Sequence, residues 1–146
     1  MRILALDIGE RRIGVAVSDP SQVLARSLQV LERTSLQEDM AAICQLVEEL
    51  QVERVIVGYP RSMDGTVGQQ ARQVEGFAYK LEQVLDVPLL LWDERLSTVT
   101  AARLLTERGI RARDQREKID AVAAAVILQD YLDSQGGSEA EEVFGR

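Results

Sequence analysis

The sequence predicts an α/β domain built on a central mixed sheet of five strands with helices on both faces. The first three apolar segments are joined by short connections, which is typical of antiparallel strands. Two later apolar segments alternate with long segments of helical periodicity, an order typical of parallel strands covered by helices. We expect one domain over residues 1–133 and a disordered, acidic, glycine-rich tail over residues 134–146.

The strands are predicted from short apolar segments that end at turn-forming residues. They cover residues 2–8, 13–18, 23–31, 53–59 and 88–92. Pro60 stops the fourth strand before a loop that contains the turn-forming pair Asp64-Gly65. The fifth strand, PLLLW, has four consecutive apolar residues after its proline, so we expect it to be buried on both faces.

The helices are predicted from apolar residues that recur every three or four positions. They cover residues 36–51, 67–86, about 98–108 and about 115–133. Ser35 and Glu38 fit a capping box before the first helix, and Asp114 is expected to cap the last one. One side of the second helix is apolar and should face the core: Val67, Ala71, Val74, Phe77, Ala78, Leu81 and Val84.

The composition limits the chemistry that this chain can perform. It contains no histidine, which excludes Ser-His-Asp and Cys-His catalysis. The single cysteine, Cys44, cannot form an intrachain disulfide and is interpreted as a small core residue, which suits a cytoplasmic protein. A zinc site is therefore not expected either. Metal chemistry would have to use oxygen ligands, and these favour Mg²⁺ or Mn²⁺.

The apolar segments are too short to cross a bilayer, and acidic residues interrupt the first one early. We therefore expect no signal peptide and no membrane partner. The net charge of −7 argues at first against nucleic acid. Residues 103–118, however, carry six bases and three acids, and such a local basic segment can bind phosphate.

Three acidic residues stand where a buried carboxylate would be chemically useful. Asp7 ends the first strand, and Glu94 follows the last. Asp120 is the only charged residue between Lys118 and Asp130, so its burial there would be costly without a partner. Converging carboxylates repel one another unless a cation lies between them. The pattern therefore favours a site for one or two Mg²⁺ or Mn²⁺ ions that acts on a phosphodiester.

Each acid also has a simpler interpretation. Asp7 could accept hydrogen bonds in a turn, Glu94 could pair with Arg95 at the surface, and Asp120 could interact with the helix dipole. Adjacent residues of an extended strand face opposite sides, so either Asp93 or Glu94 can point at the site. The longer Glu94 is preferred, and Asp93 stays a candidate for an outer role.

Other polar residues near these acids have two open interpretations. Arg11 and Arg12, in the turn after Asp7, could contact phosphate or lie in solvent. Ser97 and Thr98 are interpreted first as helix caps and second as phosphate donors at a helix N-terminus.

Four segments of the chain resemble the YqgF family. They are DIGERRIGVAVSD (7–19), VGYPRSMDGTVG (57–68), DERLSTVTA (93–101) and KIDAVAAAVILQDYL (118–132). The resemblance extends from about residue 1 to residue 133, and four segments in the right order make it specific. Members of the family are also called RuvX or Holliday junction resolvases, and are described as pre-16S rRNA nucleases. The resemblance implies an RNase H-like fold related to the RuvC resolvases and metal-dependent hydrolysis of a phosphodiester in rRNA 5′-end maturation.

The resemblance also implies roles for individual residues. Asp7, Glu94 and Asp120 would be the catalytic and metal-binding triad, of the two-metal-ion type, with Mg²⁺ or Mn²⁺ as cofactor. Binding of nucleic acid would involve a groove shaped by one loop and a basic segment before the last helix. The residues concerned are Gly58, Pro60, Asp64 and Gly65 in the loop and Arg111, Arg113, Arg116 and Lys118 in the basic segment. Arg11 and Arg12 beside Asp7 are added to this group on their position alone, not from the resemblance.

Three other functions remain open from the sequence. The first is cleavage of branched DNA, which would need two active sites and hence a dimer. The second is a nucleotide-binding domain of the actin and sugar-kinase type, although 146 residues supply one of the two domains that such a cleft needs. The third is a non-catalytic RNA-binding factor in ribosome assembly. The sequence does not predict the oligomeric state.

Overall fold

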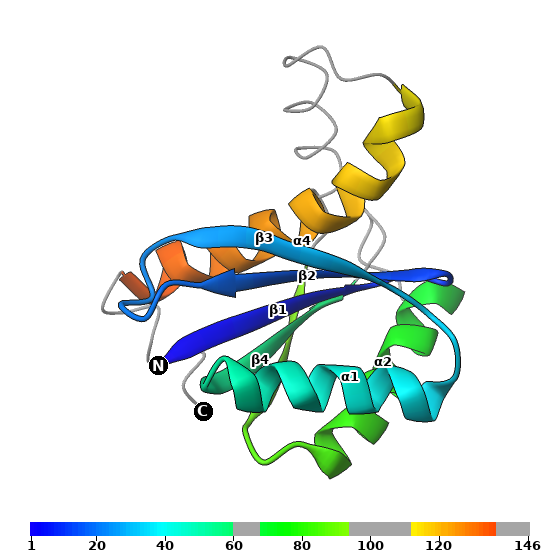
Figure 1. Ribbon diagram of the computed structural model, residues 1–146, viewed down its shortest axis with the longest axis horizontal. Helices are drawn as coiled ribbons and strands as arrows, with labels where there is room; N and C mark the ends of the chain where they lie inside the picture. Colours follow the sequence, from blue (N-terminus) through cyan, green and yellow to red (C-terminus); the bar gives the residue numbers. More distant parts are fainter. Residues whose placement is uncertain (60–67, 94–111, 137–146) are drawn as a thin grey trace.

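The computed structural model describes residues 1–59, 68–93 and 112–136, and for residues 112–121 and 136 it describes the backbone alone. Five strands and three helices lie in these ranges (Figure 1). They are β1 (Arg2–Ile8), β2 (Arg12–Ser18), β3 (Ala25–Glu32), α1 (Leu36–Glu49), β4 (Val52–Tyr59), α2 (Gln69–Val84), β5 (Leu89–Asp93) and α4 (Ala112–Gly136).

The strands form one sheet in the order β3-β2-β1-β4-β5. β1 pairs antiparallel with β2, and β2 pairs antiparallel with β3, whereas β1 with β4 and β4 with β5 are parallel. The prediction of a mixed five-stranded sheet is therefore confirmed. The parallel strands place the ends of β1, β4 and β5 at one edge of the sheet, which is where ligands of such sheets bind.

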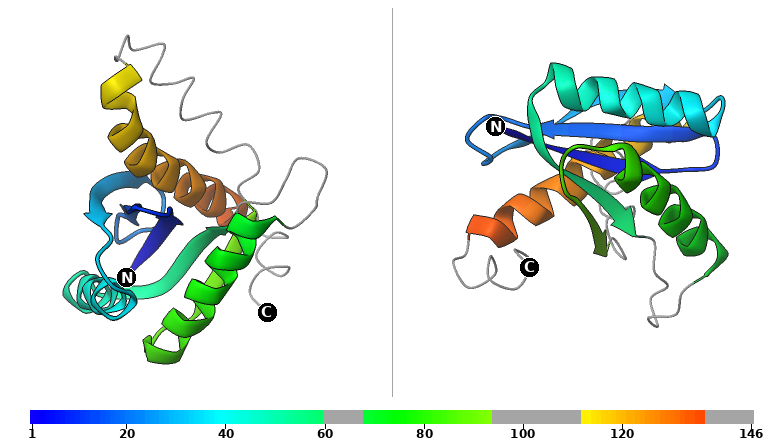
Figure 2. Two further views of the ribbon diagram at one scale, coloured as in Figure 1. Left: turned by 90° about the vertical axis from the view of Figure 1, so that its right-hand side faces the viewer. Right: turned by 90° about the horizontal axis from the view of Figure 1, so that it is seen from below.

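The two faces of the sheet carry separate hydrophobic cores. Helices α1 and α2 cover one face, and α4 crosses the other (Figure 2). Successive residues of β1 alternate between these faces, as strand geometry requires. Leu4, Leu6 and Ile8 pack with α1 and α2, while Ile3 and Ala5 pack with α4. Cys44 of α1 packs half-buried against the first core, in line with its interpretation as a core residue.

The fifth strand is less buried than its composition predicts. β5 is the outermost strand of the sheet, and Leu91 on the α2 side is 43% exposed. Val84, in the last turn of α2, is 50% exposed although its spacing placed it on the core face. Leu91 is on the edge strand, beyond which the described sheet has no further strand, and Val84 is the last residue of α2.

Two expected boundaries are also corrected. β3 begins at Ala25, because Asp19 Oδ1 accepts hydrogen bonds from the backbone N–H groups of Val23 and Leu24 and holds them in a turn. Helix α4 begins at Ala112, so Asp114 lies inside the helix rather than before it. The expected helix at 98–108 and residues 137–146 lie outside the described residues. In the part of the chain that the structure describes, none of the helices has the length and apolar character that a bilayer crossing demands.

Candidate active site

Asp7 lies near the carboxyl end of β1 and faces α4. The alternation along β1 puts Ile3 and Ala5 in the core beneath α4, and Asp7 is the next residue on that side. Its side chain is half-buried, at the edge of the sheet where β1 and β4 both end. The sequence prediction of a carboxylate at the end of a core strand is thus realised for Asp7.

Glycines occupy the positions beside Asp7 on both neighbouring strands. Gly14 of β2 is its direct antiparallel partner. On the other side, Leu6 pairs with Val57, so the next residues of the two parallel strands are Asp7 and Gly58. Because neither glycine carries a side chain, the sheet itself contributes no bulk beside the Asp7 carboxylate on the α4 face. We call these three positions the glycine-flanked row.

Position 120 belongs to α4, the helix that packs on the face of the sheet that Asp7 faces. Ala124, Ile127 and Tyr131 of α4 are buried against the sheet. Position 120 precedes Ala124 by four residues and therefore belongs to the same helical stripe. The later turns of α4 lie across the sheet, and its first turns rise away from the sheet, above the end where β1 finishes (Figures 1 and 2). Position 120 thus continues the stripe of α4 that, further along the helix, packs on the Asp7 side of the sheet.

Asp93 and Glu94, the two alternative acids of the site, lie on either side of the point where the described part of β5 ends. Trp92 pairs with Gly58 in the sheet and packs in the core beneath α4. Asp93 is the last described residue of β5, and by alternation it lies on the opposite, α2 side. Glu94 lies outside the described residues. The orientation of Asp93 away from Asp7 is the observation that favours Glu94 as the ligand.

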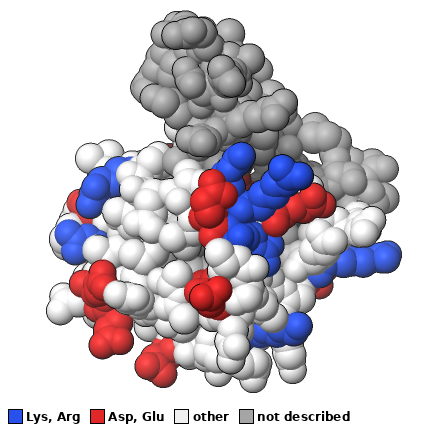
Figure 3. All heavy atoms as spheres, turned by 45° about the vertical axis from the view of Figure 1, so that its right-hand side comes forward, with Lys and Arg blue, Asp and Glu red and all other residues white. Residues whose placement is uncertain are grey.

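The predicted phosphate-binding residues are distributed over described and undescribed segments. Arg11 is exposed in the β1–β2 turn, while Arg12 has its Nε 3.7 Å from Glu32 Oε1. Arg113, Arg116 and Lys118 lie on the described backbone of α4. Pro60, Asp64, Gly65 and Arg111 lie outside the described residues, as do Ser97 and Thr98. On the face drawn in Figure 3, basic and acidic side chains lie next to one another beside the undescribed atoms.

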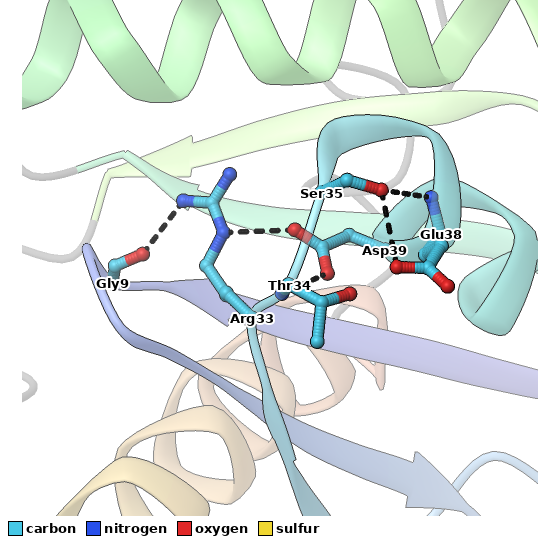
Figure 4. A network of polar contacts seen from close by, with 6 residues as sticks. All are labelled: Gly9, Arg33, Thr34, Ser35, Glu38 and Asp39. Carbon is cyan, nitrogen blue, oxygen red and sulfur yellow. Dashed lines mark hydrogen bonds and ion pairs between the residues drawn. The ribbon is translucent and has the colours of Figure 1, made fainter.

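The sequence interpretation missed a polar network behind the site. Arg33 donates from Nη1 to the Gly9 carbonyl oxygen at 2.8 Å and from Nε to Asp39 Oδ2 at 3.1 Å (Figure 4). Asp39 is only 6% exposed. The sole signal in the sequence was an acid in the first turn of α1, which helix-dipole reasoning explains without any partner.

The residues of the glycine-flanked row fit a hard divalent cation. Asp7 supplies carboxylate oxygens, the ligands that Mg²⁺ and Mn²⁺ prefer, and the two glycines leave room beside them. Within the described ranges, no three His, Cys, Asp or Glu side chains gather to hold a metal ion. The side chains of Glu94 and Asp120 are not described, so the complete triad stays a prediction.

Comparison with known proteins identifies the family. The family model described as "RuvX: Holliday junction resolvase" matches residues 1–134. A "Putative pre-16S rRNA nuclease" of Desulforamulus reducens is 46% identical over 134 residues, which cover 92% of this chain and 98% of that protein. The protein of the same name from Caldanaerobacter subterraneus subsp. tengcongensis is 46% identical over 139 residues, or 94% of this chain and 100% of that protein.

A solved structure supports the same assignment at the level of the fold. T. thermophilus RuvC in complex with a Holliday junction substrate matches 94% of this chain and 98% of its own, with a TM-score of 0.59 at 17% identity. This likeness confirms the expected RNase H-like fold. Since the family match extends over almost the whole sequence and the relatives share nearly half of its residues, the chain belongs to the RuvX family.

Proposed function

We propose that this protein is a metal-dependent nuclease that hydrolyses phosphodiester bonds in the 5′-end maturation of pre-16S ribosomal RNA. The observation that carries the proposal is the glycine-flanked row, in which Asp7 faces α4 between Gly14 and Gly58. The printed names of the relatives, pre-16S rRNA nuclease, support the choice of RNA. We assign the activity to a single domain of residues 1–133, acting in the cytoplasm.

The residues of the site would divide the work between metal binding and phosphate binding. Asp7, Glu94 and Asp120 would hold Mg²⁺ or Mn²⁺ through carboxylate oxygens. The bound cation would supply a water of lowered pKa and positive charge next to the phosphate. Asp7 is held by a strand that is paired on both sides, so its carboxylate needs little reorganisation when the site is loaded.

The substrate would approach through the gap that the glycines leave. A phosphodiester backbone is bulky, and side chains at positions 14 and 58 would occupy the space beside Asp7. Arg113, Arg116 and Lys118 precede Asp120 on α4 and would neutralise phosphate charge at that end of the sheet. Arg11, exposed in the turn after β1, would add a further phosphate contact.

A second candidate is cleavage of four-way DNA junctions. It is favoured by the description of the family model, Holliday junction resolvase. The two activities share the same metal chemistry and differ in the nucleic acid that the surface accepts. Resolution of a junction also requires two sites that act on opposed strands, so this candidate predicts a dimer in solution.

The proposal is tested by cleavage of matched substrates. Purified protein is incubated with a pre-16S rRNA 5′ leader or with four-way junction DNA, each with Mn²⁺, with Mg²⁺ and with EDTA. We expect cleavage of the RNA with metal and none with EDTA. Asp7→Asn should lower the rate by about a hundredfold or more, because even partners of metal ligands contribute up to about that factor.

The control variant is Asp86→Asn, an exposed acid before the amino end of β5, which should cleave at the wild-type rate. Cleavage that persists in EDTA or in Asp7→Asn would overturn the proposed site. Binding of RNA without cleavage under any metal condition would instead favour a non-catalytic assembly factor, and cleavage of the junction alone would favour the resolvase.

A further inference from the structure

We propose that Arg33 is a positioning residue for Asp7, which it serves by holding the β1–β2 turn in place from the opposite face of the sheet. This inference rests on the proposed function, because it concerns the carboxylate that would bind the metal. Arg33 lies in the short connection between the end of β3 and the start of α1. It makes contact with three separate elements around the end of β1.

The guanidinium group of Arg33 is held on three sides. Nη1 donates to the Gly9 carbonyl oxygen at 2.8 Å, and Nε donates to Asp39 Oδ2 at 3.1 Å. The group also lies 5.1 Å from the centroid of the Phe77 ring in α2. Figure 4 shows the side chain of Arg33 between the turn that contains Gly9 and the first turn of α1. The planar guanidinium suits these simultaneous contacts, whereas a lysine ammonium would not reproduce them.

Asp39 fixes the position of Arg33. It is 6% exposed, and a carboxylate buried to this degree requires a charged partner and hydrogen bonds. Oδ2 has the Arg33 guanidinium, and Oδ1 accepts from the backbone N–H of Thr34 at 3.1 Å. Separation of this pair would leave a buried charge without its partner, so the Arg33 side chain is strongly restrained.

The turn that Arg33 contacts is narrow and directly follows Asp7. The Gly9 N–H donates to the Arg12 carbonyl oxygen at 2.8 Å. A Cβ atom at position 9 would itself lie 2.8 Å from that oxygen, closer than real Cβ atoms approach. The backbone N–H of Arg33 also donates to the Arg11 carbonyl oxygen at 2.9 Å. Arg33 therefore contacts both limbs of the turn, one through its side chain and one through its backbone.

The placement of the network explains why it would matter to Asp7. Asp7 faces α4, whereas Phe77 belongs to the core under α1 and α2, and Arg33 lies over its ring and pairs with Asp39 of α1. The end of β1 is thus held without adding any side chain to the face on which metal and phosphate would bind. Removal of the Arg33 side chain should let the turn at Gly9 move. The Asp7 carboxylate, two residues before Gly9 in the chain, should then move with it.

The test compares Arg33→Met, Arg33→Lys and Asp39→Asn with wild type. We expect Arg33→Met to raise the Mn²⁺ concentration for half-maximal cleavage by about tenfold, the lower end of the effect of partners that orient metal ligands. The rise in melting temperature caused by Mn²⁺, measured without substrate, should shrink in parallel. Arg33→Lys and Asp39→Asn, which each retain part of the network, should be intermediate. Amide exchange at Gly9 in EDTA should accelerate in the same order.

The matched control is Val47→Ala, which removes buried volume near the other end of α1 and touches neither Gly9 nor Arg33. It should lower the melting temperature without shifting the Mn²⁺ midpoint. If Arg33→Met does not fold, Arg33→Lys carries the same comparison. Variants that lose stability yet keep the wild-type Mn²⁺ midpoint and Gly9 exchange rate would overturn the inference. A wild-type protein that neither cleaves RNA nor responds to Mn²⁺ would count against the proposed function instead.

Discussion

The rings of Trp92 and Tyr131 meet edge to face, with centroids 5.4 Å apart and an angle of 89° between their planes. The contact joins the end of β5 to α4. In the sequence Glu94 directly follows β5, and Asp120 lies within α4. Tyr131 is fully buried, and its hydroxyl accepts a hydrogen bond from Arg54 Nη1 of β4. A single side chain of α4 thus contacts both β4 and β5.

Tyr131→Phe should cost about 1–3 kcal/mol of unfolding free energy, because it removes the Arg54 partner while keeping the ring contact. Arg54 Nε already lies buried without a hydrogen-bond partner among the described atoms. Urea unfolding measures the effect. The double variant with Arg54→Met should lose less than the sum of the two single variants, since each breaks the same bond. Additive losses would mean that the hydroxyl and the guanidinium do not interact in solution.

The Asp120→Asn variant distinguishes a metal-binding Asp120 from a structural one by whether stability without metal rises or falls. Two carboxylates about 6 Å apart repel by roughly 3 kcal/mol at an effective dielectric of about 20. In EDTA the variant should therefore be as stable as wild type or more stable, and it should lose cleavage and most of the stabilisation by Mn²⁺. Thermal melts with EDTA and with Mn²⁺ decide the matter. A variant that is less stable in EDTA yet gains normally from Mn²⁺ would show that the acids do not form one site.

Gly14→Ala should reduce the stabilisation by Mn²⁺ and the cleavage rate, because the added methyl group lies beside Asp7 on the α4 face. Gly76→Ala is the matched control. Position 76 is on α2 with no atom within 4 Å of the added Cβ, and the change should stabilise the helix by about 0.5–1 kcal/mol. Melts with and without Mn²⁺ compare the two. Equal responses to Mn²⁺ in both variants would contradict the role given to the glycine-flanked row.

The basic segment should contribute to nucleic-acid affinity by binding phosphates. Changing Arg111, Arg113 and Arg116 to alanine should weaken RNA binding and reduce the slope of log K against log salt by about 0.7–0.9 for each phosphate that is no longer neutralised. The control replaces Arg72 and Lys80, exposed on α2, by alanine and should leave the slope unchanged. An unchanged slope in the triple variant would move the binding surface toward Arg11 and Arg12.

Two acids should affect stability with opposite dependence on pH. Burial, and then the neighbouring Asp133 carboxylate, raise the pKa of Asp130. The folded state therefore holds that proton more tightly, and stability falls as pH rises from the unfolded pKa of about 4 through the native pKa. Asp130→Asn should be more stable than wild type at pH 7, and this gain should vanish near pH 3. Thermal melts of wild type and Asp130→Asn between pH 3 and pH 7 measure this difference. A gain in stability that persists at pH 3 would contradict the raised pKa of Asp130.

The pKa of Asp19 is shifted in the opposite direction to that of Asp130. Hydrogen bonds from the Ser21 hydroxyl and the backbone N–H groups of Leu24 and Val23 hold the pKa of Asp19 well below its usual range. The stability that it contributes is present above the unfolded pKa and is lost as pH falls through the native pKa. Asp19→Asn should therefore be less stable than wild type at pH 7. The difference between them should narrow only under strongly acidic conditions.

The sequence alone determined the order of the elements, the mixed sheet and the placement of an acid at the end of a core strand. These follow from local properties, namely the period of the apolar residues, the length of each segment, and the short turns that require antiparallel pairing. The capping role of Ser35 belongs to the same class, because a cap acts within one turn of its own helix. The family resemblance added the triad, of which Asp7 alone has a described side chain.

Only the tertiary structure decided which residues from distant segments meet. Gly14 and Gly58 flank Asp7 because of strand register, and register is set by the pairing of whole strands rather than by any one residue. Leu91 is exposed because β5 is the outermost strand, a property of strand order. Arg33 and Asp39 pair across the start of α1 because burial makes an unpaired charge costly, and burial exists only once the layers have packed.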